Sequence, residues 1–262
     1  IISSLDVTIT IYEKSTIDLV DNYATKNNKK IKTHLKIDTG LSRLGTQWTD
    51  AKATMDRWHQ TSSNIIKEGI YSHYANSDQK EHPLNQLQLN RFDESKANAN
   101  TQLSHLSNSD GLTHFNTSQC NVVRIGLSVY DNSFTLSAPV RLIKTIESGT
   151  SVSYGSKFTA SEPTKIGVIG MGYADGLSTH LSNKGYVIIN GYNCPIIGQI
   201  CMCMFMVKLP QNSAINVNDM ATIISPDNTP GMTIKEMGKL TQQNPREIMT
   251  HFSERVTRIY LN

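Results

Sequence analysis

The 262-residue sequence lacks any apolar run of the roughly 18 residues that a membrane-spanning helix needs, so no segment is expected to cross a bilayer. It also lacks an excess of one charge, because 25 basic residues stand against 22 acidic ones and the formal net charge is +3. A net charge this small argues against nucleic acid as a partner and favours an anionic small molecule. Repeats of solenoid length and low-complexity tracts are absent as well.

Cysteine is scarce. Four cysteines do not make a disulfide framework in a chain of this length, so a reducing compartment, the cytoplasm, is expected. Cys201 and Cys203 form the one close pair, and on an extended strand both sulfurs would point to the same face. Because no second Cys or His pair is spaced to complete a tetrahedral site, no metal is expected.

The amino terminus lacks an initiator methionine, a basic region and a cleavage site, so it is not a signal peptide. A strand pattern at residues 7–11 follows almost at once. We therefore expect the chain to be an amino-terminally truncated fragment of a longer protein.

From residue 7 to about residue 131 strand patterns alternate with helical ones, which predicts a parallel sheet. The expected strands lie within residues 7–11, 30–37, 69–74, 101–107 and 121–130. Amphipathic spacing predicts helices after the first strand, around residues 48–58, and from Pro83 onward.

Polar residues gather at the carboxyl ends of these strands, which is the edge where a (β/α)8 barrel builds its active site. They are Lys36, His73, Asn108 with Ser109, and Arg124. About five strands are fewer than the eight that close such a barrel, so the remainder is expected upstream.

After about residue 137 short extended runs are separated by glycine, asparagine and proline, a pattern typical of an antiparallel β domain. One helix is expected there, at residues 234–243. The predicted fold class is α/β plus β: a partial (β/α)8 TIM-type barrel, residues 1–137, followed by a carboxy-terminal antiparallel β domain, residues 138–262.

Collinear strings resemble the alanine racemase family, whose members are pyridoxal-phosphate (PLP) enzymes with a (β/α)8 barrel and a carboxy-terminal β domain. The strings are HLKIDTGLSRLG (34–45), YSHYANSD (71–78), NSDGL (108–112), VVRIGLSVYD (122–131), VSYGSKFTASEP (152–163), IGMGYADGL (169–177) and GQICM (198–202). The resemblance implies a homodimeric amino-acid racemase that uses PLP, interconverts L- and D-alanine and supplies D-amino acid for cell-wall peptidoglycan.

The resemblance also implies catalytic roles. Tyr154 matches a tyrosine that reaches in from the partner subunit and exchanges a proton on one face of the substrate. His73 matches the histidine that partners this tyrosine, and Arg124 matches the arginine directed at the pyridine nitrogen of PLP. Without the resemblance, these residues read as a packed ring, a structural hydrogen-bonder and a rim ion pair.

Further positions match the family's binding residues. Those expected to bind the phosphate are Asn108, Ser109, Ile125 and Gly126, and those expected to contact the substrate are Lys36, Arg43, Tyr173 and Met202. Lys36 matches a lysine that is carbamylated in many relatives and positions Arg43. The alternative is that Lys36 and Arg43 are solvated charges and that Tyr173 is a packed strand aromatic.

The sequence departs from the family pattern at three places. The cofactor lysine, which the family carries in its first barrel strand, has no match, so the chain alone is expected to be inactive. Cys203 replaces an aspartate, and Arg246 replaces a tyrosine that reaches the phosphate and borders the substrate. An arginine at this place still offers phosphate a partner.

These departures leave serine open as the substrate, because the membrane-tethered serine racemases of glycopeptide resistance share this catalytic domain. The location would then be a cytoplasm-facing domain of a tethered parent. Two further hypotheses are a non-catalytic module that binds PLP or an amino acid, and a two-domain binding protein without cofactor.

Overall fold

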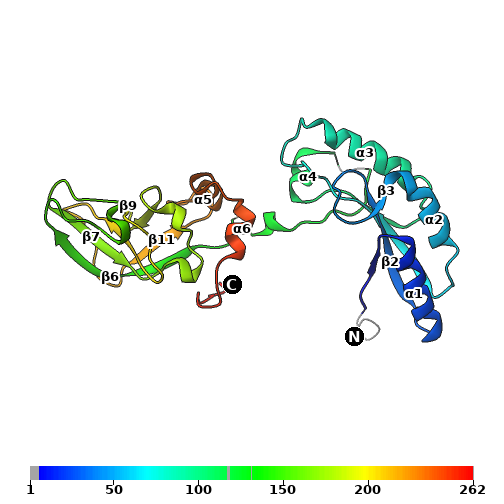
Figure 1. The fold of residues 1–262 in the computed structure, drawn as a ribbon, viewed down its shortest axis with the longest axis horizontal. Coiled ribbons are helices and arrows are strands. Elements are labelled where there is room, and N and C mark those ends of the chain that lie inside the picture. Colours follow the sequence, from blue (N-terminus) through cyan, green and yellow to red (C-terminus); the bar gives the residue numbers. More distant parts are fainter. Residues whose placement is uncertain (1–5, 117–118, 131, 262) are drawn as a thin grey trace. The chain divides into compact units, whose positions relative to one another are not determined.

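The computed structural model describes residues 6–116, 119–130 and 132–261 (Figure 1). The chain divides into two compact units, Ile1–Ser128 and Val129–Asn262. The boundary predicted near Ser137 falls inside the first strand of the second unit. Among the described residues, no helix has the length and apolar character needed to cross a membrane.

The first unit is built on a parallel sheet with the strand order β1-β2-β4-β5. Its strands are β1 (Ile9–Ile11), β2 (Ile31–Asp38), β4 (Ile65–Tyr71) and β5 (Leu103–His105), and the short β3 (Thr46–Gln47) pairs with the end of β2. The helices are α1 (Lys14–Lys26), α2 (Ala51–His59), α3 (Pro83–Lys96) and α4 (Ser109–His114). The predicted alternation of strand and helix is confirmed.

Strand β2 shows how sequence alternation places the two faces of this sheet. Ile31, Leu35 and Ile37 are buried in one hydrophobic core with residues of α1, α2 and α3, which Figure 1 shows beside the sheet. Trp58 of α2 donates its Nε1–H to Thr33 on the same face, over 3.0 Å. The intervening residues of β2, which include His34 and Lys36, therefore point to the opposite, polar face.

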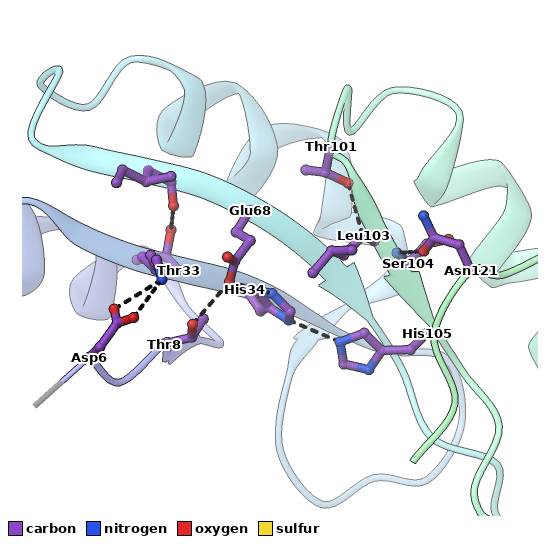
Figure 2. Close-up of polar contacts among 12 residues, drawn as sticks. Asp6, Thr8, Thr33, His34, Glu68, Thr101, Leu103, Ser104, His105 and Asn121 are labelled. Atoms are coloured by element: carbon purple, nitrogen blue, oxygen red, sulfur yellow. Dashed lines mark hydrogen bonds and ion pairs between the residues drawn. The ribbon is translucent and has the colours of Figure 1, made fainter.

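The strand expected within residues 121–130 does not form. Residues 121–126 run beside β5 without strand pairing, and a 3-10 turn follows at Leu127–Val129. The side chain of Asn121 explains this difference. Its Oδ1 accepts from the backbone N–H of Ser104 at 2.8 Å, where a paired strand would offer a backbone carbonyl (Figure 2). From this segment the backbone N–H groups of Val122 and Arg124 donate to the carbonyls of Ser104 and Ser107, which is too few bonds for a strand ladder.

The second unit is a closed antiparallel barrel with the order β10-β7-β6-β11-β8-β9. Its strands are β6 (Leu136–Ile146), β7 (Thr164–Ile169), β8 (Tyr186–Ile189), β9 (Tyr192–Ile197), β10 (Phe205–Lys208) and β11 (Met220–Ile224). Residues 194–209, which read as one extended run, split into β9 and β10 around a loop that begins at Gly198. The antiparallel β domain was predicted; closure was not.

Two helices follow this barrel in sequence. Helix α5 (Ile234–Thr241) was expected, whereas α6 (Pro245–Thr250) was missed. The signal for α6 is present in the sequence, because Asn244 caps it by accepting from the Arg246 N–H at 2.9 Å and Pro245 occupies its first turn.

Replacing a buried phenylalanine in the barrel of the second unit tests which contacts stabilise this barrel. Phe205 is fully buried in β10, so Phe205→Ala is expected to lower the free energy of unfolding by about 3–5 kcal/mol through lost burial and a cavity. Leu142→Ala, at a half-exposed position of β6, is the matched control and should change it by less than about 0.5 kcal/mol. Urea unfolding followed by circular dichroism measures both, and equal losses would contradict this assignment of the core.

Candidate functional site

At the carboxyl ends of β2, β4 and β5, two of the polar residues predicted for this edge, Lys36 and Arg124, lie around the ring of Tyr71. The Nζ atom of Lys36 lies 5.4 Å from the ring centroid, and the Cζ atom of Arg124 lies 5.2 Å from it. The ring of His105 stacks on Tyr71 with 4.7 Å between centroids. The Tyr71 hydroxyl bonds to Oγ1 of Thr10 at 2.9 Å.

Arg124 is anchored entirely by neutral acceptors among its described contacts. Its Nη2 donates to the carbonyls of Ser72 (2.7 Å) and Leu106 (3.2 Å) and to Nδ1 of His73 (3.0 Å). Its Nη1 bonds to Nδ1 of His105. The guanidinium is therefore fixed in place while its positive charge stays available to an anionic or electron-rich partner.

A second cation lies close by. Lys36 is only 7% exposed, and its pKa is lowered by burial first and then by the charges of Arg43 and Arg124, with partial compensation from Asp38. Cations that destabilise one another's charge indicate a site prepared for an anion.

The loop that carries Arg43 is organised by Asp38. Its Oδ1 accepts the backbone N–H groups of Gly40, Leu41 and Ser42 at 2.9, 3.0 and 3.1 Å. The loop returns at Gly45, where φ is +132° and an added Cβ would lie 2.8 Å from the backbone nitrogen of Asp38. Arg43 itself is exposed at the surface of this loop.

The residues predicted to bind phosphate meet at the start of α4. The Oδ1 of Asn108 accepts from the Gly111 N–H (2.9 Å) and from the Ser77 hydroxyl (2.8 Å). The Oγ of the buried Ser109 accepts from the backbone N–H of Gly126 at 3.0 Å, which joins two distant parts of the sequence. An added Cβ at Gly126 would meet no atom within 4 Å, and Ile125 beside it is half exposed.

In the second unit Tyr154, Tyr173 and Met202 lie on loops that are bonded to one another through residues 199–202. The Oγ of Ser153 donates to the Gln199 carbonyl (2.6 Å), and the backbone N–H groups of Tyr173 and Ala174 donate to the carbonyls of Cys201 (3.1 Å) and Met202 (2.9 Å). The side chain of Tyr154 is 75% exposed, and those of Tyr173 and Met202 are about half exposed.

Close backbone approach explains two glycines of these loops. An added Cβ at Gly172 would lie 2.3 Å from the Cys201 carbonyl oxygen, and one at Gly198, where φ is +72°, would lie 2.6 Å from the Val152 oxygen. The loops therefore form one rigid support for the exposed side chains.

Cys203 belongs to a polar cluster that sequence reasoning missed. Arg255 donates from Nε to Asp175 Oδ1 (3.0 Å) and from Nη2 to the Cys203 sulfur (3.6 Å). Asp175 in turn accepts the Gly172 N–H at 2.9 Å. Arg246 lies exposed in the first turn of α6.

Sequence reasoning also missed Tyr71 and His105, although both occupy the last position of a strand that it did predict. The signal was the same one that found Lys36, a polar residue at the carboxyl end of a parallel strand. Each of the two is followed closely in the sequence by a residue with a clearer chemical role, His73 and Asn108.

A parallel α/β unit with a cationic strand edge, followed by an antiparallel β unit, is the architecture of the barrel-type amino-acid racemases. The sequence profile "Alanine racemase, N-terminal domain" matches residues 1–133, and "Alanine racemase, C-terminal domain" matches residues 133–260. The chain belongs to the alanine racemase family, and the family and fold class predicted from sequence are confirmed.

Similar proteins include alanine racemase 2 of Caldanaerobacter subterraneus subsp. tengcongensis, 30% identical over 276 residues, which cover 98% of this chain and 71% of that protein. The alanine racemase of Fusobacterium nucleatum is 33% identical over 90% of this chain and 70% of its own length. The relatives support a racemase, an isomerase acting on an amino acid.

Solved structures agree. Alanine racemase from Streptomyces lavendulae superposes with a TM-score of 0.89 at 28% identity, covering 98% of this chain and 73% of that one. Alanine racemase from Bartonella henselae with covalently bound pyridoxal phosphate superposes with a TM-score of 0.88 at 27% identity, covering 99% of this chain and 75% of that one.

The buried histidine at this edge makes stability depend on pH. Burial first, and then the charge of Arg124, lower the pKa of His105 from 6.5 to about 3. Between these values the unfolded chain binds a proton that the folded chain does not, so the free energy of unfolding should fall as pH falls from 6.5 towards 3. Urea unfolding across this range should show a shallower pH dependence for His105→Gln, and identical dependences would refute the assignment.

Proposed function

We propose that this protein is a pyridoxal-phosphate-dependent racemase that interconverts L- and D-alanine as a cytoplasmic homodimer and so supplies D-alanine for cell-wall peptidoglycan. The observation that carries the proposal is the part-buried Arg124, fixed by neutral acceptors beside Lys36. When bound, PLP supplies the electron sink that lets an α-proton leave a substrate amino acid.

The residues present fit this cofactor. The charges of Arg43 and Arg124, which lower the pKa of Lys36, make this strand edge positive and suit a ligand that carries an anionic phosphate. Ser109 and Gly126 are bonded to each other beside open space, and they would hold the phosphate together with Asn108 and Ile125. The family resemblance adds Arg246 to the residues expected to bind phosphate. Arg124 would face the ring nitrogen and, being permanently charged, keep that nitrogen unprotonated.

Tyr154 would hold and release the proton on one face of the substrate, in the site of the partner subunit. Its exposure leaves the phenol available to a second copy of the chain. A phenol takes a proton from carbon only as its anion, so the site has to stabilise that anion. We expect His73 to give this stabilisation, because Nδ1 of His73 accepts from Arg124 and the proton of its neutral ring is then on Nε2, as a donor.

Lys36 and Arg43 would prepare the substrate side. The lowered pKa of Lys36 raises the fraction of neutral amine, the form that adds to carbon dioxide with loss of a proton. The carbamate so formed replaces a cation by an anion and would fix Arg43 by charge. Tyr173 and Met202 would border the substrate entrance.

The opposite face of the substrate needs a second base. The resemblance assigns it to the lysine that carries the cofactor in the family's first barrel strand, for which this sequence has no match, so the chain alone is proposed to be inactive. The experiments below therefore use the full-length protein loaded with PLP.

Replacing Tyr154 tests the one-sided proton transfer. Tyr154→Phe should slow α-proton abstraction from one enantiomer of alanine by about 10²–10⁴-fold, and from the other enantiomer far less. Exchange of the α-proton with deuterium from solvent, measured by NMR for L- and D-alanine separately, gives both rates.

Tyr192→Phe is the matched control, because Tyr192 is a part-exposed tyrosine of the same unit, in β9. It should leave both rates unchanged. Equal slowing of the two enantiomers by Tyr154→Phe would contradict a role on one face. No exchange with alanine or serine would defeat the racemase proposal and favour a binding module.

Serine is the alternative substrate, because Arg246 places hydrogen-bond donors where relatives carry a tyrosine. Arg246→Tyr should then lower the ratio of kcat/KM for serine to that for alanine by about 10-fold, the scale of one lost polar contact. Steady-state kinetics with both amino acids measure the ratio. An unchanged ratio would show that Arg246 does not set the substrate preference.

A further inference from the structure

A row of hydrogen bonds crosses the polar face of the first sheet and ends at Arg124. Figure 2 shows Glu68 of β4, His34 of β2 and His105 of β5 side by side, with Thr8 beside the carboxylate. His34 Nε2 lies 3.1 Å from Glu68 Oε2, and His34 Nδ1 lies 2.9 Å from His105 Nε2. Thr8 donates its hydroxyl to the same Oε2 at 2.9 Å.

The direction of each bond follows from Arg124, because a guanidinium only donates. Nδ1 of His105 must accept from it, so the proton of neutral His105 is on Nε2. That proton is donated to Nδ1 of His34, which places the proton of His34 on Nε2, pointing at the Glu68 carboxylate. Both tautomers are thus determined from both ends of the row.

The surroundings keep both rings neutral. Burial is the main cause that lowers the pKa of His34 and of His105, and the charge of Arg124 acts in the same direction on both. For His34 the Glu68 carboxylate opposes the shift. Other groups at this face are Lys36 beside Tyr71 and the Tyr71 ring stacked on His105.

The backbone makes room for this row. An added Cβ at Gly69, next to Glu68, would lie 2.8 Å from Cε1 and from Nε2 of His34. Glycine at this position therefore lets the His34 ring lie between its two partners.

We propose that Glu68 and His34 are positioning residues, which hold His105 as its Nε2–H tautomer so that His105 accepts from Arg124 and keeps the guanidinium at the strand edge. The opposite tautomer would turn an N–H of His105 against an N–H of Arg124. The ligand group that Arg124 faces rests on the proposed function. The fixed tautomers of His34 and His105, called the tautomer lock, rest on these contacts alone.

The test reads the tautomers directly. In the 262-residue chain labelled with ¹⁵N-histidine and free of cofactor, long-range ¹H–¹⁵N NMR should show the proton on Nε2 of both His34 and His105 at pH 7. The single variants His34→Gln and His105→Gln assign the signals. A proton on Nδ1 of His105 in the unaltered chain would overturn the proposal.

Glu68→Gln should release the lock, because a carboxamide both donates and accepts and so permits either tautomer of His34. Because Arg124 then remains as the one end that fixes the row, a second tautomer is expected at His34 and, through the shared hydrogen bond, at His105. Glu94→Gln, the same change at an exposed position of α3, is the control and should alter neither ring. Unchanged tautomers in Glu68→Gln would overturn the proposal.

Gly69→Ala is a second way to disturb the row, and it keeps the carboxylate. It should displace His34 and change the His105 signals as Glu68→Gln does. Unchanged His105 signals in a folded Gly69→Ala chain would overturn the link between the two rings.

A kinetic readout on the full-length protein loaded with PLP separates this inference from the proposed function. Glu68→Gln should lower kcat for alanine by about 10-fold, the scale of a lost supporting contact, with KM little changed. Mixed tautomers with an unchanged kcat would overturn the positioning role in catalysis. If tautomers respond as expected while the unaltered protein exchanges no α-proton, the lock stands and the proposed function fails.

Discussion

A part-buried guanidinium, that of Arg124, whose described hydrogen-bond acceptors are all neutral is the constraint on which the first unit depends. Removing an unpaired charge from water is costly, and the cost is offset here by the hydrogen bonds that Arg124 donates to carbonyls and imidazoles. These acceptors come from the ends of β4 and β5, so the strands must be in register for the charge to be tolerated. Fold and site are thus consequences of the same set of contacts.

This constraint also explains the polar face of β2. An interior lined by His34 and Lys36 would be unfavourable without partners across the sheet. Glu68 and His105 supply those partners to His34, and the aromatic face of Tyr71 lies below the Lys36 ammonium. The alternation that buries Ile31, Leu35 and Ile37 on one face of the sheet therefore places the polar side chains of β2 on the other face.

Much of this organisation could be predicted from the sequence, because periodicity and strand-end positions are local properties. They gave the parallel sheet, the antiparallel β domain and residues such as Lys36, His73 and Arg124. Several of the missed features depend on contacts between distant segments. Asn121 replaces a strand carbonyl only because Ser104 lies beside it, and Arg255 reaches Cys203 only in the folded unit. The closure of the second barrel is likewise a pairing of distant strands.

The loop at residues 199–202 has a consequence for how this protein changes over generations. It is held by its own carbonyls, which bind the N–H groups of Tyr173 and Ala174, and by the Gln199 oxygen that Ser153 reaches. Main-chain atoms are the same whatever residue is encoded. The side chain of Met202 can therefore change through single codons while the main-chain bonds that hold the loop stay intact.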